Sequence, residues 1–109
     1  MPDVLKSAFF ASDPEAYPDL AEVLRGAKRL GPAGTSESAG PVLGGGLAVS
    51  KVQSALVQLG YASNPPTGYF DQQTAAVVSR FKTYWHLTPH DGVVGRFTLA
   101  ALDYEMIGR

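Results

Sequence analysis

The stretch GYFDQQTAAVV at residues 68–78 is matched by GVVGRFTLAAL at residues 92–102, at an offset of 24 positions. Each stretch begins with a glycine, carries an apolar residue two positions later and has threonine as its seventh residue. Glycine tolerates a positive φ, so we expect the chain to turn at the start of each stretch. The small residues that follow the threonine predict a helix directly after each turn. Solenoids need about three repeats to bury a continuous core, so two units indicate pseudo-symmetry within one small domain.

Eight positions of these two units are expected to be structural. They are Gly68, Phe70, Asp71, Thr74, Gly92, Val94, Gly95 and Thr98. Phe70 and Val94 are predicted to point inward. Asp71 is the expected N-cap of the first helix, whereas Gly95 leaves the amides of the second helix open. The threonine hydroxyls are expected to bond back into their turns.

Hydrophobic periodicity predicts three helices in the second half of the chain. We expect them over about residues 48–59, 72–85 and 96–107. No stretch alternates for long enough to require a strand, and only Tyr69–Phe70 and Val93–Val94 are short extended candidates. The predicted fold class is therefore all-α, a compact three-helix bundle over about residues 47–107.

The first half of the chain predicts one amphipathic helix and a linker. The helix is expected to start near Asp13–Pro14 or Pro18–Asp19 and to continue to Leu30, with apolar residues at helical spacing. Residues 31–46 are rich in Gly, Pro and Ser and predict a flexible linker. We thus divide the chain into residues 1–30, 31–46 and 47–109. The helix of the first segment either packs on its own domain or docks on a partner protein.

The amino-acid composition excludes several classes of protein. The 109 residues are 45% hydrophobic and 17% charged with a net charge of −1, which is ordinary globular usage and lacks the basic surface of a nucleic-acid binder. The chain has no cysteine, and no apolar run approaches the roughly 18 residues of a membrane span. Its first residues lack the basic start and apolar stretch of a secretory signal. We expect it to be cytoplasmic as synthesised.

Motifs for catalysis and cofactors are not found. Among the sought patterns, H-E-x-x-H, G-x-S-x-G and G-x-x-x-x-G-K-[ST] do not occur. His86 and His90 have no third ligand nearby in sequence, so we expect loop histidines and no metal. We expect no enzyme activity and no cofactor.

Three ordered motifs resemble the peptidoglycan-binding domain, a three-helix module appended to many bacterial cell-wall hydrolases. Residues 49–61, VSKVQSALVQLGY, are similar to its V-x-x-L-Q-x-x-L-x-x-L-G-Y helix. Residues 67–82, TGYFDQQTAAVVSRFK, are similar to D-G-x-F-G-x-x-T-x-x-A-V-x-x-F-Q. Residues 87–102, LTPHDGVVGRFTLAAL, are similar to L-x-x-D-G-x-V-G-x-x-T-x-x-A-L, with one extra residue before the glycine.

The departures from the family pattern fall on polar and turn positions. Thr67 replaces aspartate, Asp71 replaces glycine, Lys82 replaces glutamine, and His86 stands where the family ends its second helix with glycine. This pattern permits a domain that keeps the scaffold and has lost or changed its ligand.

The resemblance implies non-catalytic recognition of peptidoglycan, through its glycan or its stem peptide. Aromatic, amide and cationic side chains suit such a ligand. The candidate ligand-binding residues are Tyr69, Gln72, Gln73, Arg80, Tyr84, Arg96 and Phe97. If the pseudo-symmetry brings the two turns together, these residues border one groove.

The alternative is a structural or adaptor subunit of a phage-like or contractile injection assembly that uses the same fold for protein docking, with the N-terminal helix and linker of residues 1–46 contributing to contacts with other subunits. For either role, a protein without a signal reaches the cell wall only by lysis, an injection particle or a non-standard export route.

Overall fold

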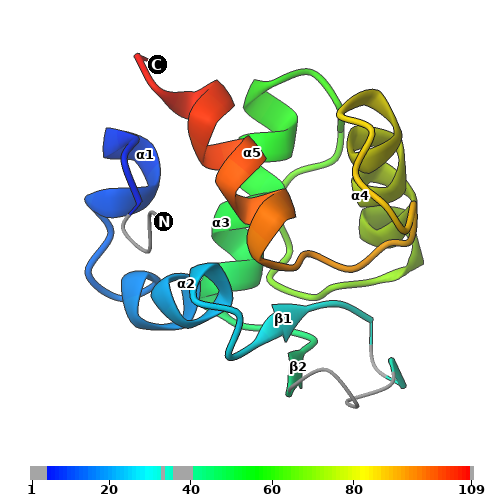
Figure 1. The fold of residues 1–109 in the computed structure, drawn as a ribbon, viewed down its shortest axis with the longest axis horizontal. Helices are drawn as coiled ribbons and strands as arrows, with labels where there is room; N and C mark the ends of the chain where they lie inside the picture. Colours follow the sequence, from blue (N-terminus) through cyan, green and yellow to red (C-terminus); the bar gives the residue numbers. More distant parts are fainter. Residues whose placement is uncertain (1–4, 33, 36–40, 109) are drawn as a thin grey trace.

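The computed structural model describes residues 5–32, 34–35 and 41–108. Its elements, in chain order, are α1 (Ala8–Ala11), α2 (Tyr17–Leu24), β1 (Arg29–Leu30), β2 (Val42–Leu43), α3 (Leu47–Gln58), α4 (Gln72–Tyr84) and α5 (Arg96–Met106). Figure 1 shows α3 and α5 at the centre, α4 on one side and α1 and α2 on the other. The fold is all-α, and the three helices predicted in the second half lie within two residues of their expected bounds.

The apolar faces of the three long helices form the core. Val52 and Leu56 of α3, Phe81 of α4, and Leu99 and Leu102 of α5 are fully or almost fully buried. These residues recur at three- or four-residue spacing, which places them on one side of each helix. The periodicity that predicted the helices is therefore the pattern that buries them.

The two glycine turns are built alike. Phe70 and Val94 are both buried, as expected. Each pairs its backbone with an extended segment, because the Phe70 N–H donates to the Gly44 carbonyl (2.8 Å) and the Val94 N–H donates to the Leu30 carbonyl (2.7 Å). Gly68 has the expected positive φ of 82°. Each turn thus delivers one apolar side chain to the core at the start of a helix.

Gly92 is required for a different reason from the one expected. It is not among the positive-φ residues. A Cβ at Gly92 would lie 2.5 Å from the Ala75 Cβ and 2.7 Å from the Ala75 Cα and carbonyl oxygen. The second turn therefore packs on the first turn of α4 so closely that neither residue has room for more atoms.

A thin layer of extended backbone joins the two turns. Strands β1 and β2 are parallel, with Arg29 opposite Val42 and Leu30 opposite Leu43. Leu30 also bridges Val94, and Gly45 bridges Tyr69. The sequence did not predict these strands, because each is two residues long and depends on partners far away in the chain. The layer lies under the N-terminal ends of α4 and α5, beside the starts of both repeats (Figure 1).

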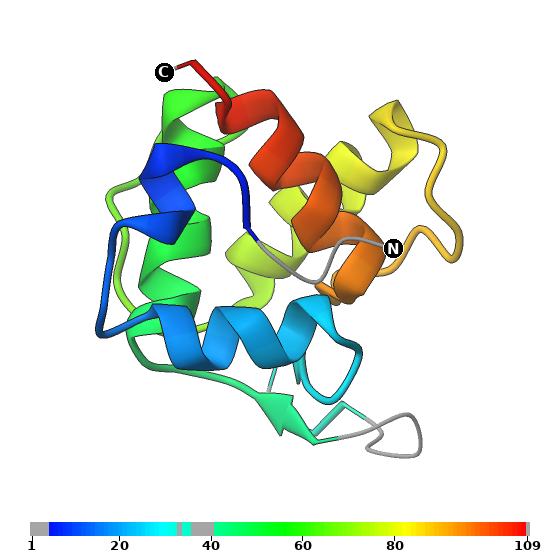
Figure 2. The same ribbon diagram turned by 60° about the vertical axis from the view of Figure 1, so that its left-hand side comes forward.

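The N-terminal segment packs on the body of the same chain. Figure 2 shows α1 and α2 against α3 and α5. Phe10 and Leu20 are fully buried in the common core. On α5, the buried Asp103 accepts hydrogen bonds from the Lys6 N–H (2.8 Å), the Ser7 N–H (2.9 Å) and the Ser7 hydroxyl (2.7 Å). Of the two readings of this segment, the structure shows the packed one.

Two expectations for the first half need correction. The helix does not continue to Leu30 but ends at Leu24, because Gly26 adopts φ 85° and the chain leaves the helix there. Within the expected linker, Val42–Leu43 form β2. Residues 33 and 36–40 of that linker lie outside the described residues, and the division of the chain into three domains stays a prediction.

The Gly92–Ala75 contact gives a stability prediction. We expect Gly92→Ala to lower the free energy of unfolding by about 1–3 kcal/mol, since the added methyl meets backbone atoms that cannot move aside. Urea unfolding measures the loss. Gly95→Ala is the matched control, because no atom lies within 4 Å of that Cβ, and it should change stability by less than about 0.5 kcal/mol. Equal effects of the two variants would contradict the packing account.

Candidate functional site

The first glycine turn is held by one buried side chain, Gln53 of α3. Its Nε2 group donates to the Tyr69 carbonyl (2.7 Å) and to the Thr74 hydroxyl (2.9 Å). Its Oε1 atom accepts from the backbone N–H groups of Thr67 (3.0 Å) and Gly68 (2.9 Å). The side-chain amide of Gln53 therefore makes hydrogen bonds to both sides of the turn and to the first turn of α4.

The second glycine turn is held in the same way by Lys82 of α4. Its buried ammonium group donates to the Val93 carbonyl (2.9 Å) and to the Asp91 carboxylate (2.5 Å). Val93 and Asp91 lie 24 positions after Tyr69 and Thr67, the partners of Gln53. Lys82 is one of the departures from the family pattern. It holds the second turn by hydrogen bonds, as Gln53 holds the first.

A hollow lies beside each turn, and equivalent positions of the two repeats line both hollows. The first hollow, of about 40 Å³, is lined by residues that include Asn64, Pro65, Thr67, Asp71, Gln73 and Thr74. The second hollow, of about 440 Å³, is lined by residues that include Thr88, Pro89, Asp91, Gly95, Phe97 and Thr98. Every residue of the second set follows its counterpart by 24 positions. The repeat therefore duplicates a surface hollow as well as a turn and a helix.

The first hollow opens into a longer groove. A third hollow, of about 520 Å³, lies between the loop after α3 and the outer face of α4. It shares Ala62, Asn64, Gln73 and Val77 with the first hollow. We call the two together the α4 groove. Its second part also has Arg80, which donates to the Tyr61 carbonyl (2.6 Å) and so ties α4 to the loop.

The expected ligand residues divide between these surfaces. Gln73 and Arg80 line the α4 groove. Tyr84 lies next to the groove residue Tyr61, and the centroids of the two rings are 6.1 Å apart, so the exposed ring of Tyr84 extends this surface. Arg96 and Phe97 line the second hollow. Tyr69 and Gln72 are exposed and line none of the three hollows.

Among the described residues the two turns do not border the single groove expected for them, because the hollow beside the second turn shares no lining residue with the α4 groove. The extended layer lies between them, since Tyr69 bridges Gly45 at one side and Val94 bridges Leu30 at the other. That these residues bind a ligand stays a prediction.

Several residues of the site were not singled out from the sequence. Gln53 lies within the first helical motif, and its burial depends on a turn 14 residues later. Tyr61 packs edge-to-face on Phe81, with the ring centroids 5.1 Å apart. Asn64 carries no local signal. A polar residue at an otherwise apolar helix position was the one available clue to Gln53.

Local electrostatics are set by short-range contacts. The Thr74 N–H (2.8 Å) and hydroxyl (2.8 Å) donate to the Asp71 carboxylate and hold its pKa below the ordinary value. Asp71 is therefore the N-cap of α4, as predicted. Partial burial raises the pKa of Tyr61, with the nearby Glu105 adding to it.

His86 ends α4 in a left-handed conformation, with φ 57°. Glycine is the usual residue there, and another residue costs roughly 1–2 kcal/mol.

The described residues contain no group of three or more metal-ligating side chains. Nor do they contain a helix long and apolar enough to cross a bilayer.

Residues 45–102, more than half of the chain, match the family model described as "Putative peptidoglycan binding domain". The chain belongs to this family. The matched range contains both glycine turns, both of the side chains that hold them and the whole α4 groove. The eight structural residues of the two repeats all lie within the matched range.

A curated relative from Kitasatospora aureofaciens, titled "Uncharacterized protein in bpoA1 3'region", is 43% identical over 61 residues. The alignment covers 55% of this chain and 51% of the relative, so the chain spans about half the length of the relative it matches. No solved structure matches the chain.

The Lys82 contacts predict a clear difference between two substitutions. Lys82→Met should lower the free energy of unfolding by about 2–3 kcal/mol, because the Val93 carbonyl loses its donor and Asp91 its partner. Lys82→Gln restores the family residue and a donor, so it should cost less than half as much. Lys51→Met is the control, since the Lys51–Asp13 pair is looser, at 3.8 Å, and should contribute under about 1 kcal/mol. Chemical denaturation compares the three, and equal losses would exclude the proposed role of Lys82.

The Asp71 cap predicts a pH dependence. Its pKa is lower in the folded than in the unfolded chain, so its stabilising effect is present above the ordinary value of 3.8 and is lost as pH falls through the folded value. Asp71→Ala should cost about 1 kcal/mol at pH 7. The difference from wild type should shrink at pH 2–3. Thermal unfolding at both pH values checks this, and a pH-independent difference would count against the charged cap.

Proposed function

We propose that this chain is a non-catalytic module that binds bacterial peptidoglycan, with the α4 groove as its main contact surface. The family match over residues 45–102 carries the proposal, together with the position of the groove inside that range. Residues of both the first and the second family motif line the groove.

The groove offers the groups that peptidoglycan needs. The polymer presents amide and hydroxyl groups along its sugars and its peptides. Asn64, Gln73 and Ser63 provide neutral donors and acceptors along the groove, and Arg80 provides a cation beside them. Such a mixture favours a polar, uncharged or weakly anionic polymer.

Tyr84 supplies an aromatic surface at the end of the groove. Its side chain is 70% exposed although its ring rests against Tyr61. An aromatic ring held by a second ring is a rigid platform for the apolar face of a sugar. We therefore assign the glycan to the Tyr84 end of the groove.

The alternative role in a phage-like or contractile injection assembly uses the three-helix scaffold, the N-terminal helix and the linker to dock on other subunits. The apolar face of α2, with Leu20 and Val23, is buried in the core of this chain. That face is not available to a partner. Cell-wall recognition is thus the better-supported proposal, and the route to the wall stays a prediction.

Retention on purified sacculi tests the proposal. Wild-type protein should sediment with sacculi and release no soluble fragments from them. Tyr84→Ala should weaken retention about 10-fold, as loss of a central aromatic contact does at other interfaces. Tyr104→Ala is the matched control, because Tyr104 is a similarly exposed tyrosine (67%) on α5 whose ring packs on Trp85 and not on Tyr61 of the groove, and it should bind as wild type does. No sedimentation of wild type, or equal losses in both variants, would refute the assignment.

A further inference from the structure

The second hollow differs from the first at the residue that begins its helix. Asp71 and Gly95 occupy equivalent positions, and their backbones are nearly superimposable, with φ/ψ of −92°/−177° and −99°/−168°. In the first hollow the Asp71 carboxylate fills the space over the helix start. In the second hollow Gly95 has no side chain to do so.

The groups that bind the carboxylate in the first repeat are present in the second without a partner. The Thr74 hydroxyl donates to Asp71 at 2.8 Å. Its counterpart Thr98 lines the second hollow and is only 3% exposed. Within the described residues the Thr98 side chain makes no hydrogen bond, and α5 has no side-chain cap. The Thr98 residue is almost fully buried, and its hydroxyl faces the hollow with its hydrogen-bonding capacity unused by the described residues.

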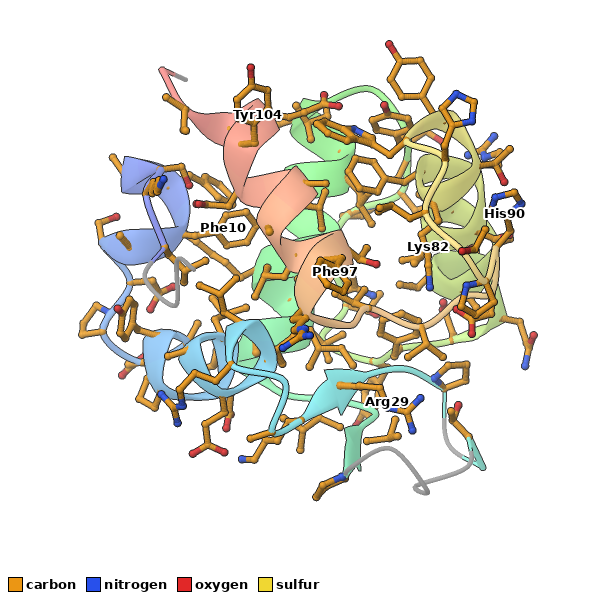
Figure 3. The ribbon with its side chains drawn as sticks, viewed as in Figure 1. Phe10, Arg29, Lys82, His90, Phe97 and Tyr104 are labelled. Atoms are coloured by element: carbon orange, nitrogen blue, oxygen red, sulfur yellow. The ribbon has the colours of Figure 1, made fainter. Side chains whose placement is uncertain are left out.

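The charged side chains of the second hollow suit an anionic acceptor. Lys82 and Arg96 line it, against one carboxylate, Asp91, among its lining residues. Lys82 uses two of its three ammonium hydrogens, on Asp91 and Val93. The Arg96 guanidinium lies over the Phe97 ring, 4.8 Å from its centroid, at the mouth of the hollow. In Figure 3, Lys82, Phe97 and Arg29 come from three different elements around this region.

We propose that the second hollow binds a carboxylate group of the ligand, in the place that the Asp71 carboxylate takes in the first hollow. Thr98 and the open end of α5 would donate to the carboxylate, and Arg96 would neutralise it from the mouth. The inference rests on the proposed function and adds a substrate class to it. The carboxylate belongs to the stem peptide, because the sugars bound by a Tyr84 platform offer mainly hydroxyl and amide groups.

Gly95→Asp tests the proposal by supplying the carboxylate within the chain. The backbone already has the Asp71 conformation, and no atom lies within 4 Å of a Cβ at this position. The variant should cap α5 and raise the melting temperature by several degrees. It should also weaken binding of soluble muropeptides with a free stem-peptide carboxylate by 10-fold or more. Gly95→Ala is the control, with binding within about twofold of wild type.

The ligand arm of the experiment uses the same muropeptides with their carboxylates amidated. Calorimetric titration should show wild type binding the free acid about 10-fold more tightly than the amide. Arg96→Gln should remove most of that preference. Equal binding of acid and amide by wild type, or an unaltered affinity in Gly95→Asp, would overturn the carboxylate site.

Sacculus sedimentation separates this failure from failure of the proposed function. If wild type sediments with sacculi but does not distinguish acid from amide, the chain binds the wall and the second hollow is not its carboxylate site. If wild type neither sediments nor binds the muropeptides, both proposals fall. If Gly95→Asp loses the preference for the acid while Tyr104→Ala keeps it, the carboxylate site stands.

Discussion

The structure depends on one arrangement used twice: a buried polar side chain from one helix holds the glycine turn that starts the next. Gln53 does this for the first turn and Lys82 for the second. Each turn directs backbone groups at the preceding helix, and these groups are partly buried in the first turn and buried at Val93 in the second, so a partner from the protein stabilises them. By satisfying them, the two side chains fix where Phe70 and Val94 enter the core and where α4 and α5 begin. The hollows lie at those helix starts, so the same contacts set the shape of the candidate site.

Much of the fold could be predicted from the sequence because its decisive signals are local. The spacing of apolar residues located α3, α4 and α5, and Asp71 was recognisable as a cap three residues before Thr74. Features that depend on distant partners could not be predicted. Leu30 sits in a strand because it meets Val94, and the close approach of Gly92 to Ala75 replaces the expected positive φ.

The candidate site was predictable by residue type but not by position. Gln73, Arg80 and Tyr84 are candidates by type, as amide, cation and aromatic, and helical spacing places them along one side of α4. Arg96 and Phe97 were chosen on the same grounds, yet they belong to a separate hollow. The extended layer that separates the hollows consists of segments without a period-two pattern. Nothing local in the sequence indicates that they lie between the two turns.

The departures from the family pattern need not indicate a lost ligand. Each turn pairs its holding side chain with a suitable neighbour: the neutral Gln53 faces Thr67, and the cationic Lys82 faces Asp91. Thr67 and Lys82 are thus explained by the demands of the fold and carry no information about binding. The contrast between Asp71 and Gly95 is of another kind, because the same backbone is filled in one repeat and left open in the other. The two turn–helix units are therefore alike in how a side chain of the preceding helix holds the turn, and they differ at the residue that begins the helix. The same scaffold thus presents two different surfaces.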